Sequence, residues 1–336
     1  MAGYSYRYCW HCDIGGGQHL PRKNCLLMNF KTRRLLSSDS RYIIVVLAPI
    51  ILLIAFFIYY PAINTFQTSQ TNFNLRIHRE QGKAKFRGFD NYVKLVEDEE
   101  FWEVTGRSFK VVIITLPLEM AVAFGIAMLL NQRFPGRGVM RTLTILPWML
   151  PGVVNGFLWG WLLNGEYGAL NGFLYQLGLI SEYQYWLREP DHQLFWVTVV
   201  QTWTRYAFPT IILLAGLQSI PEDLYDAAKV DGSNALSRVR YITFPLLLPS
   251  FGIALVVEFI AAFQIFDVVW TLTAGSSAGG AMNPFTKTLM LYNYELVFRD
   301  LRVGLGAALS YIILVMSLFV GLIFVWRVYN QGVQEQ

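Results

Sequence analysis

Six apolar runs, each of roughly 20 residues, constrain this chain more than any other feature. They cover residues Tyr42–Tyr60, Val111–Leu130, Leu143–Leu163, Phe195–Leu217, Phe251–Leu272 and Leu305–Val325. A helix of about 20 residues crosses a hydrocarbon core of about 30 Å and satisfies its own backbone hydrogen bonds there. Strict two-residue alternation, the mark of a barrel strand, is absent from these runs. The sequence therefore predicts an all-α polytopic membrane bundle with about six transmembrane helices.

The composition agrees with a lipid-embedded chain. Only 15% of the residues are charged and 54% are hydrophobic, whereas soluble domains carry about a quarter charged residues. The net charge of +4 is spread between the apolar runs and forms no basic stripe, so we expect no nucleic-acid partner.

The basic residues also predict an orientation. The short segment 131–141 holds Arg133, Arg137 and Arg141 and no acid, which favours the cytoplasmic side. A basic stretch also precedes the first run. We interpret the run itself as a membrane anchor, and not as a signal peptide that is cleaved off. Segment 61–103 is basic too, but it is longer and mixed with acids. We expect a cytoplasmic tail (1–40), a membrane domain (41–327, core 105–327), a short tail (328–336) and both termini in the cytoplasm.

The extreme N-terminus contains the three cysteines of the chain. Cys9, Cys12 and Cys25, together with His11 and His19, have a spacing that zinc can use. A disordered tail, or a translation start at Met28, is the simpler interpretation, and we predict no metal site. With no cysteine in the apolar runs, no disulfide framework is expected.

Residues 219–250, between the fourth and fifth runs, predict two short helices outside the bilayer. Ser219 and Glu222 have the spacing of a capping box, so a helix is expected to begin near Pro221. Asp231-Gly232 breaks this helix, and Ser233 or Asn234 can cap a second one. We expect the second helix to run to the prolines at 245 and 249.

The same segment resembles the E-A-A-x3-G-x9-I-x-L-P loop of binding-protein-dependent ABC import permeases. The matching residues are Asp226, Ala227, Ala228, Gly232, Ile242 and Pro245, with Asp in place of Glu at 226 and Phe in place of Leu at 244. Asp231, directly before the glycine, is also expected to belong to this coupling loop. Three further stretches look like the maltose and trehalose type of sugar permease: FDNY (89–92), NGEYGALN (164–171) and FQIFDVVWTLTAG (263–275). The resemblance extends from about residue 41 to residue 327.

This resemblance implies a multi-pass subunit of a bacterial or archaeal plasma membrane. It implies a second homologous permease, an ABC ATPase dimer that grips the loop as a coupling helix, and an extracytoplasmic solute-binding protein. ATP and Mg would be bound by the ATPase, and this chain would bind no cofactor. In that role Ala227 and Ala228 permit close approach to the partner, Gly232 permits the turn, and Asp226 can pair with a basic partner residue.

The sequence contains no motif that could hydrolyse ATP. It contains no G-x4-G-K-[ST] phosphate loop and no H-E-x-x-H metal motif. We therefore expect a transport subunit, and not an enzyme, with no catalytic residues.

Polar residues within the apolar runs indicate a solute pathway, because ionisable groups in a span are costly and usually face a cavity. Helical spacing places three of them and an aromatic ring on one face of the fourth run: Gln201, Thr204, Arg205 and Phe208. Three more follow on the fifth run: Glu258, Gln264 and Asp267. Hydroxyl-binding groups beside rings such as Phe208 or Trp203 suit a sugar. The alternative is that Arg205 and Glu258 form a buried ion pair that fixes packing.

The favoured function is import of a di- or oligosaccharide. An importer for glycerol phosphate or a polyamine is the nearest alternative, and a secondary transporter, a channel or a membrane-embedded enzyme are more distant ones. The small residues 304–308 suit packing against either a partner permease or this chain itself.

Overall fold

The computed structural model describes residues 38–78, 80–274 and 285–334. Two compact units make up the chain, Met1–Tyr60 and Pro61–Gln336. The cysteines and histidines of the zinc alternative lie outside the described residues, so that alternative stays untested.

Within its described residues the first unit contains one apolar helix. Helix α1 (Ser38–Ile54) continues into a π-helical turn, η1 (Ala55–Tyr59). Large apolar side chains along it are exposed, among them Leu52 and Phe57 at 67% each. An exposed apolar surface of this kind suits contact with lipid.

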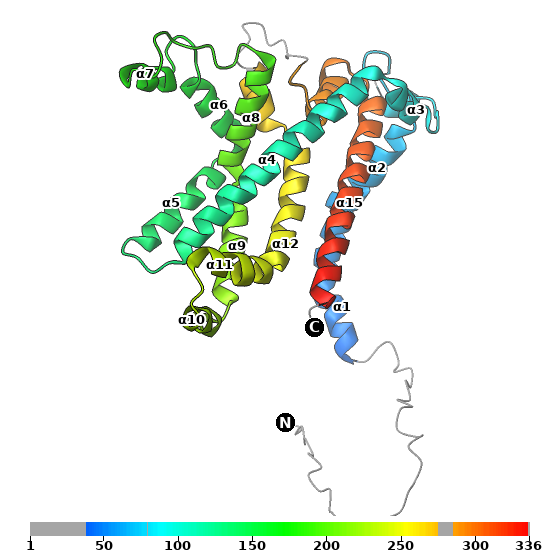
Figure 1. Cartoon of the computed structure of the whole chain (residues 1–336). Helices are drawn as coiled ribbons and strands as arrows, with labels where there is room; N and C mark the ends of the chain where they lie inside the picture. The colour runs from blue at the N-terminus through cyan, green and yellow to red at the C-terminus, as the bar shows by residue number, and fades with distance from the viewer. Residues whose placement is uncertain (1–37, 79, 275–284, 335–336) are drawn as a thin grey trace, which may run out of the picture. The chain divides into compact units, whose positions relative to one another are not determined.

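In its described part the second unit consists of helices joined by turns and loops, and its only strand-like feature there is one isolated bridge between Thr71 and Phe86. In chain order its elements (Figure 1) are α2 (Tyr60–Ser69, whose first residue ends the first unit), the 3-10 turn η2 (Gln81–Lys83), α3 (Asp90–Glu97), α4 (Glu99–Asn131), α5 (Arg137–Met149), α6 (Gly152–Leu162), α7 (Ala169–Gln176), α8 (Pro190–Arg205), α9 (Ala207–Ser219), α10 (Glu222–Val230), α11 (Ala235–Arg238), the π-turn η3 (Val239–Thr243), α12 (Phe244–Phe263), α13 (Asp267–Val269), the π-turn η4 (Trp270–Ala274), α14 (Leu289–Tyr294), the π-turn η5 (Glu295–Arg299) and α15 (Val303–Gln334).

The expected helical membrane bundle is confirmed, but its spans are less regular than six straight helices. Four described helical stretches are long and apolar enough to cross a membrane: Val45–Ser69, Glu99–Asn131, Ala235–Phe263 and Val303–Trp326. The pair α5 and α6 makes a fifth if a bend of 96° is allowed. On length and hydropathy, the described residues therefore give four or five spans.

The third and fourth predicted spans are both interrupted. The chain bends at Leu150-Pro151, where the ψ of Leu150 is 136°. A residue that precedes proline is pushed out of the α region, so the run 143–163 is not the one continuous helix that was expected, although α5 and α6 together can still form one broken span. The fourth run is divided at Tyr206 between α8 and α9.

The fifth predicted span begins and ends earlier in the chain than expected. Its helical stretch runs without a break from Ala235 to Phe263 and therefore includes Pro245 and Pro249. The expectation that these prolines end the second short helix is wrong. Pro245 directly follows the π-turn η3 within this continuous stretch, and membrane helices tolerate internal proline.

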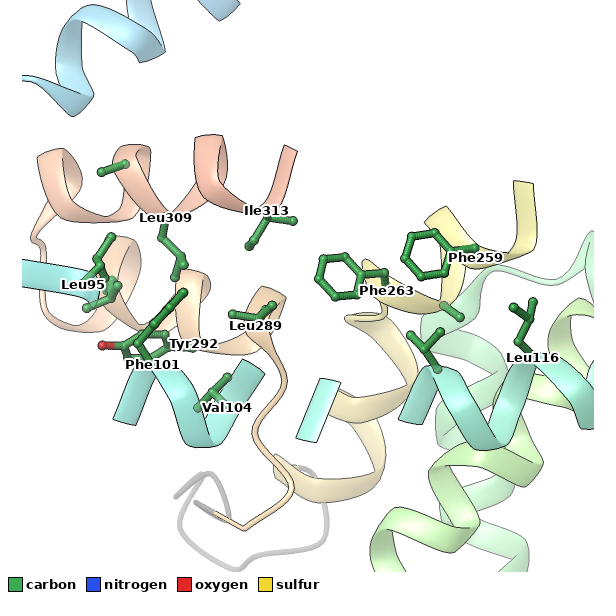
Figure 2. Close-up of a cluster of buried hydrophobic side chains, with 14 residues drawn as sticks. Leu95, Phe101, Val104, Leu116, Phe259, Phe263, Leu289, Tyr292, Leu309 and Ile313 are labelled. Carbon is green, nitrogen blue, oxygen red and sulfur yellow. The ribbon is translucent and has the colours of Figure 1, made fainter. Parts of the chain in front are cut away.

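An apolar cluster joins α3, α4, α12, α14 and α15 (Figure 2). Phe259 and Phe263 from α12 stack with their centroids 5.7 Å apart. Phe101 and Val104 from α4 and Leu309 from α15 are also buried in this cluster. The packing fixes α4 and α12 against each other, which matters because both helices carry buried carboxylates.

Candidate functional site

The segment from Pro221 to Thr243, here called the two-helix segment, protrudes from one end of the helices of the second unit. Figure 1 shows α10 and α11 beside the turn that joins α4 to α5, and α7 at the opposite end. Arg133 in that turn donates to Glu222 of α10 at 2.7 Å. Tyr225 and Thr243 share a hydrogen bond of 3.0 Å, which ties α10 to the start of the fifth span.

Gly232 sets the shape of this segment. Its φ is +79°, in the left-handed region that favours glycine. The Gly232 N–H donates to Lys229 O at 3.1 Å, and the Ser233 N–H donates to Ala228 O at 2.9 Å. This is the Schellman pattern that satisfies the last carbonyls of a helix. The predicted break at Asp231-Gly232 is therefore what the structure shows.

The helix starts match the prediction only in part. Asn234 caps α11, because its Oδ1 accepts from the Ser237 N–H at 2.8 Å. The capping box predicted for α10 is wrong: Ser219 donates to the Gly216 carbonyl, and Glu222 pairs with Arg133. Pro221 precedes the helix without a side-chain cap.

The surface of the two-helix segment is largely open and partly apolar. Helix α10 has no buried residue. Ala227 is exposed and Ala228 half-buried, while Val230 is 88% exposed and Leu236 78%. Asp226 pairs with Lys229 of its own helix at 2.8 Å and is thus less free for a partner than the sequence suggests. The other predicted positions fit an accessible loop: Asp231 is exposed, and Ile242 and Pro245 are half-buried.

Five of the seven predicted pathway residues line one pocket of about 340 Å³, a size that accommodates small ligands. They are Gln201, Thr204, Arg205, Gln264 and Asp267. The pocket lies where the end of α8 meets the break after α12. Amide, hydroxyl, guanidinium and carboxylate groups thus converge in an otherwise apolar bundle.

The remaining predicted pathway residues, Phe208 and Glu258, do not line this pocket. Because α8 ends at Arg205, its polar face does not continue to Phe208. Phe208 instead contacts the ring of Trp148, with centroids 5.8 Å apart, and Trp148 and Phe266 are the aromatic residues that line the pocket. Trp203 packs against Trp159 and does not line the pocket either.

Arg205 and Glu258 form the ion pair that the sequence left as an alternative. The Arg205 Nε donates to Glu258 Oε2 at 3.0 Å, and Nη2 donates to Oε1 at 3.3 Å. Glu258 is completely buried, while a quarter of the Arg205 side chain is exposed. The pair therefore links the protein interior to the pocket wall. The ion-pair interpretation is confirmed, while a role of Arg205 in the solute pathway stays a prediction.

Two residues near this site were missed by sequence reasoning. Trp148 lies at the end of α5, just before the bend, and only the bend brings it to the pocket. Glu119 is completely buried on α4 and lies in contact with Glu258. An acid inside the apolar run 111–130 was a signal available in the sequence.

A second ionic cluster lies at the start of the Glu99–Asn131 stretch, and its lysine and tyrosine, Lys287 and Tyr292, lie outside the four membrane-spanning stretches. Lys287 donates to Glu100 at 2.7 Å and pairs with Glu295 at 2.5 Å. Burial alone would lower the pKa of Lys287, but these two ion pairs outweigh it and raise the pKa above its usual range. Tyr292 donates to Asp98 at 3.0 Å, and burial together with this carboxylate raises the pKa of Tyr292. The cluster joins the start of α4 to α14 and η5.

Two stretches that resembled sugar permeases have structural roles here. Asn91 of the FDNY stretch donates to the carbonyls of Ser69 and Thr71, tying α3 to the end of α2. Asn171 of NGEYGALN is completely buried and accepts from Trp186 Nε1 at 3.0 Å, which orders the loop around α7.

The small residues at the start of α15 pack within the chain. Gly304 closely approaches the Thr71 carbonyl, and its N–H donates to Phe73 O at 2.9 Å. Gly306 closely approaches Val297. A side chain at either glycine would collide with these groups, which supports the intrachain explanation.

The sequence and fold of this chain match known transport proteins. The model of the family described as "Binding-protein-dependent transport system inner membrane component" matches residues 121–334. The sulfoquinovosyl glycerol transport system permease protein SmoG of Agrobacterium fabrum is 33% identical over 87% of this chain and 92% of its own length. The trehalose/maltose transport system permease protein MalF of Thermococcus litoralis is 32% identical over 86% of this chain and 94% of its own length.

The fold is shared with a chain of a bacterial ABC transporter involved in the import of the acidic polysaccharide alginate. The TM-score is 0.74, with 22% identity over 87% of this chain and 96% of that chain. Since the family model covers well over half of the chain and the relatives nearly all of it, this protein belongs to the family of binding-protein-dependent transport system inner membrane components.

Proposed function

We propose that this chain is a permease subunit of an ATP-driven ABC importer for a carbohydrate, with a di- or oligosaccharide as the favoured substrate. It pairs with a second, homologous permease around the pathway. An ABC ATPase dimer binds ATP and Mg, and an extracytoplasmic binding protein delivers the solute. Both termini and the two-helix segment then face the cytoplasm, in the plasma membrane of a bacterium or archaeon.

The exposed two-helix segment is the observation that carries this proposal. Its turn is fixed by backbone hydrogen bonds around Gly232, so it keeps its shape without burial in the bundle. It also exposes Val230, Leu236 and Tyr241, at 88%, 78% and 71%. Apolar side chains on a rigid protrusion suit a protein partner. Small residues at 227 and 228 let that partner approach closely.

The pocket supports a carbohydrate as the substrate class. Gln201 and Gln264 offer both donors and acceptors to hydroxyl groups, and Trp148 offers an apolar ring face. Among the described pocket-lining residues Arg205 is the one cation, and Glu258 already pairs with it. A phosphate or another strongly anionic solute would favour more unpaired cationic groups.

Purification of the tagged chain in mild detergent, with identification of the co-purifying subunits, tests the assembly. We expect an ABC ATPase, a second permease and a solute-binding protein. Reconstitution of these subunits in proteoliposomes then tests the substrate with a panel of sugars, glycerol phosphate and polyamines. ATP-dependent uptake of a sugar supports the proposal, whereas uptake that an ionophore abolishes and ATP does not drive would contradict it.

A further inference from the structure

Two carboxylates and one guanidinium meet in the interior of the second unit. Glu119 projects from α4, Glu258 from α12 and Arg205 from the end of α8. Both glutamates are completely buried. Helix α4 packs against both α8 and α12, and Glu119 lies within hydrogen-bonding reach of Glu258.

The hydrogen bonds of this cluster are unevenly distributed. Glu258 accepts both bonds of the Arg205 guanidinium, at 3.0 and 3.3 Å. No described donor reaches either carboxyl oxygen of Glu119. The charged groups that face Glu119 are Glu258 and Arg205, and α9, which packs along the same stretch of α4, carries no charged residue.

Charge balance decides the state of Glu119. Arg205 neutralises one carboxylate, and its contact with Glu258 is already bidentate. A second buried carboxylate without a donor would be both repelled by Glu258 and stripped of hydration. A proton on Glu119 removes both costs, because the carboxylic acid then donates a hydrogen bond to an oxygen of Glu258.

We propose that Glu119 is a positioning residue that carries a proton and donates to Glu258, which in turn holds Arg205 at the pocket wall. Glu119 does not touch the pocket itself. It acts through Glu258, whose two oxygens must be oriented to receive both nitrogens of Arg205. The role of Arg205 at the solute pocket rests on the proposed function, whereas the proton on Glu119 does not.

The variants that test this are Glu119→Gln and Glu119→Leu in the assembled importer, reconstituted in lipid nanodiscs and proteoliposomes. Glutamine keeps a neutral donor of the same shape, and leucine removes the donor while filling similar space. Infrared difference spectroscopy at neutral pH reports directly on the proton, because a protonated carboxylic acid absorbs at a higher frequency than a carboxylate. We expect a protonated-acid band in the wild type that Glu119→Gln removes.

Transport kinetics test the positioning role. Glu119→Gln should keep the KM and the kcat of the wild type. Glu119→Leu should raise the KM by about two- to tenfold, the value of one hydrogen bond, with a smaller change in kcat. Thermal unfolding of each complex in detergent separates this effect from loss of folded protein.

Three results would overturn the proposal. An absent protonated-acid band in the wild type would place a charge on Glu119. A Glu119→Gln variant with an altered KM would show that a neutral donor is not what the site needs. A folded Glu119→Leu variant with wild-type KM would leave Glu119 without a positioning role. A complex that carries no sugar would contradict the proposed function, while the infrared band would still test the proton.

Discussion

The two-helix segment and the pocket wall are built in opposite ways. The first keeps its shape through local bonds: the turn at Gly232, the cap at Asn234, and Arg238, which donates to the Ser233 carbonyl at 2.6 Å. The second depends on side chains from helices far apart in sequence, such as Arg205 and Glu258. A surface substitution on a locally built element leaves the rest of the chain folded. A substitution in the pocket wall removes contacts between helices and therefore lowers the stability of the fold. Function and stability should therefore separate in the first region and remain joined in the second.

The largest effect on transport is expected from Ala227→Arg. The long cation would keep a partner surface away from α10, and an interface position of this kind is worth about 2 kcal/mol or more, roughly 30-fold. Because Ala227 is exposed, the amount and melting temperature of the folded protein should stay unchanged. ATP-dependent uptake in proteoliposomes measures the loss. The matched control is Ala169→Arg, at an exposed position on α7, and wild-type uptake by Ala227→Arg would remove the contrast between the two regions.

The pocket wall should respond through stability. Glu258→Leu leaves the Arg205 guanidinium without its partner and should lower the free energy of unfolding by about 3 kcal/mol. The double variant Arg205→Met with Glu258→Leu replaces the pair by apolar groups and should recover most of that stability, but not sugar uptake. Denaturant unfolding in detergent measures the free energy of unfolding. Equal stability of the single variant and the wild type would mean that the ion pair does not hold the wall.

Gly232→Ala should have an intermediate and purely local effect. The added methyl group meets open space, so the cost comes from the left-handed backbone alone, about 1 to 2 kcal/mol. We expect a severalfold loss of uptake with little change in overall unfolding. Gly232→Asn should recover part of the uptake, since asparagine tolerates this conformation better. No difference between alanine and asparagine would argue against a need for this turn.

Lys287 provides a pH-dependent comparison outside both regions. Its pKa is raised in the folded protein, so its stabilising contribution is complete below the ordinary lysine value of about 10.4 and is lost as the pH rises through the folded value. Lys287→Met should therefore lower the melting temperature at neutral pH and flatten its alkaline decline. An alkaline decline identical to that of the wild type would exclude Lys287 as its cause.

Arg133→Gln should have the smallest effect. The side chains of Arg133 and Glu222 are 83% and 80% exposed. An ion pair that is exposed to this extent contributes at most about 1 kcal/mol to stability. Uptake should fall less than twofold, and the difference should vanish at high salt. A tenfold loss would show instead that Arg133 itself contacts the partner.

Local chemistry was the part of the structure that the sequence predicted well. The helix break at Asp231-Gly232 and the cap at Asn234 depend on residues adjacent in the chain, so their pattern was readable. Proline was harder to interpret. At Leu150-Pro151 it bends the chain, whereas Pro249 lies within a continuous helix. Whether a proline bends the chain or lies within a continuous helix depends on the neighbouring helices. The sequence around the proline does not show which helices these are.

The pocket shows the same limit. Helical spacing brought Gln201, Thr204 and Arg205 together correctly, since all three belong to α8. It failed at Phe208, because the helix is interrupted at Tyr206, and it had no means to find Trp148. Glu119 was readable as an acid in an apolar run, but its partner became evident only from the packing of α4 against α12.

Cross-linking from position 227 shows whether the two-helix segment faces the cytoplasm and binds the ATPase. A cysteine introduced as Ala227→Cys, in a chain whose native Cys9, Cys12 and Cys25 are replaced by serine, is treated with a short bifunctional thiol reagent in the assembled complex. We expect a cross-link between position 227 and a cysteine placed on the ATPase surface. We also expect that membrane-impermeant maleimide, added outside intact cells, does not label position 227. Labelling from the outside, with no cross-link to the ATPase, would contradict it.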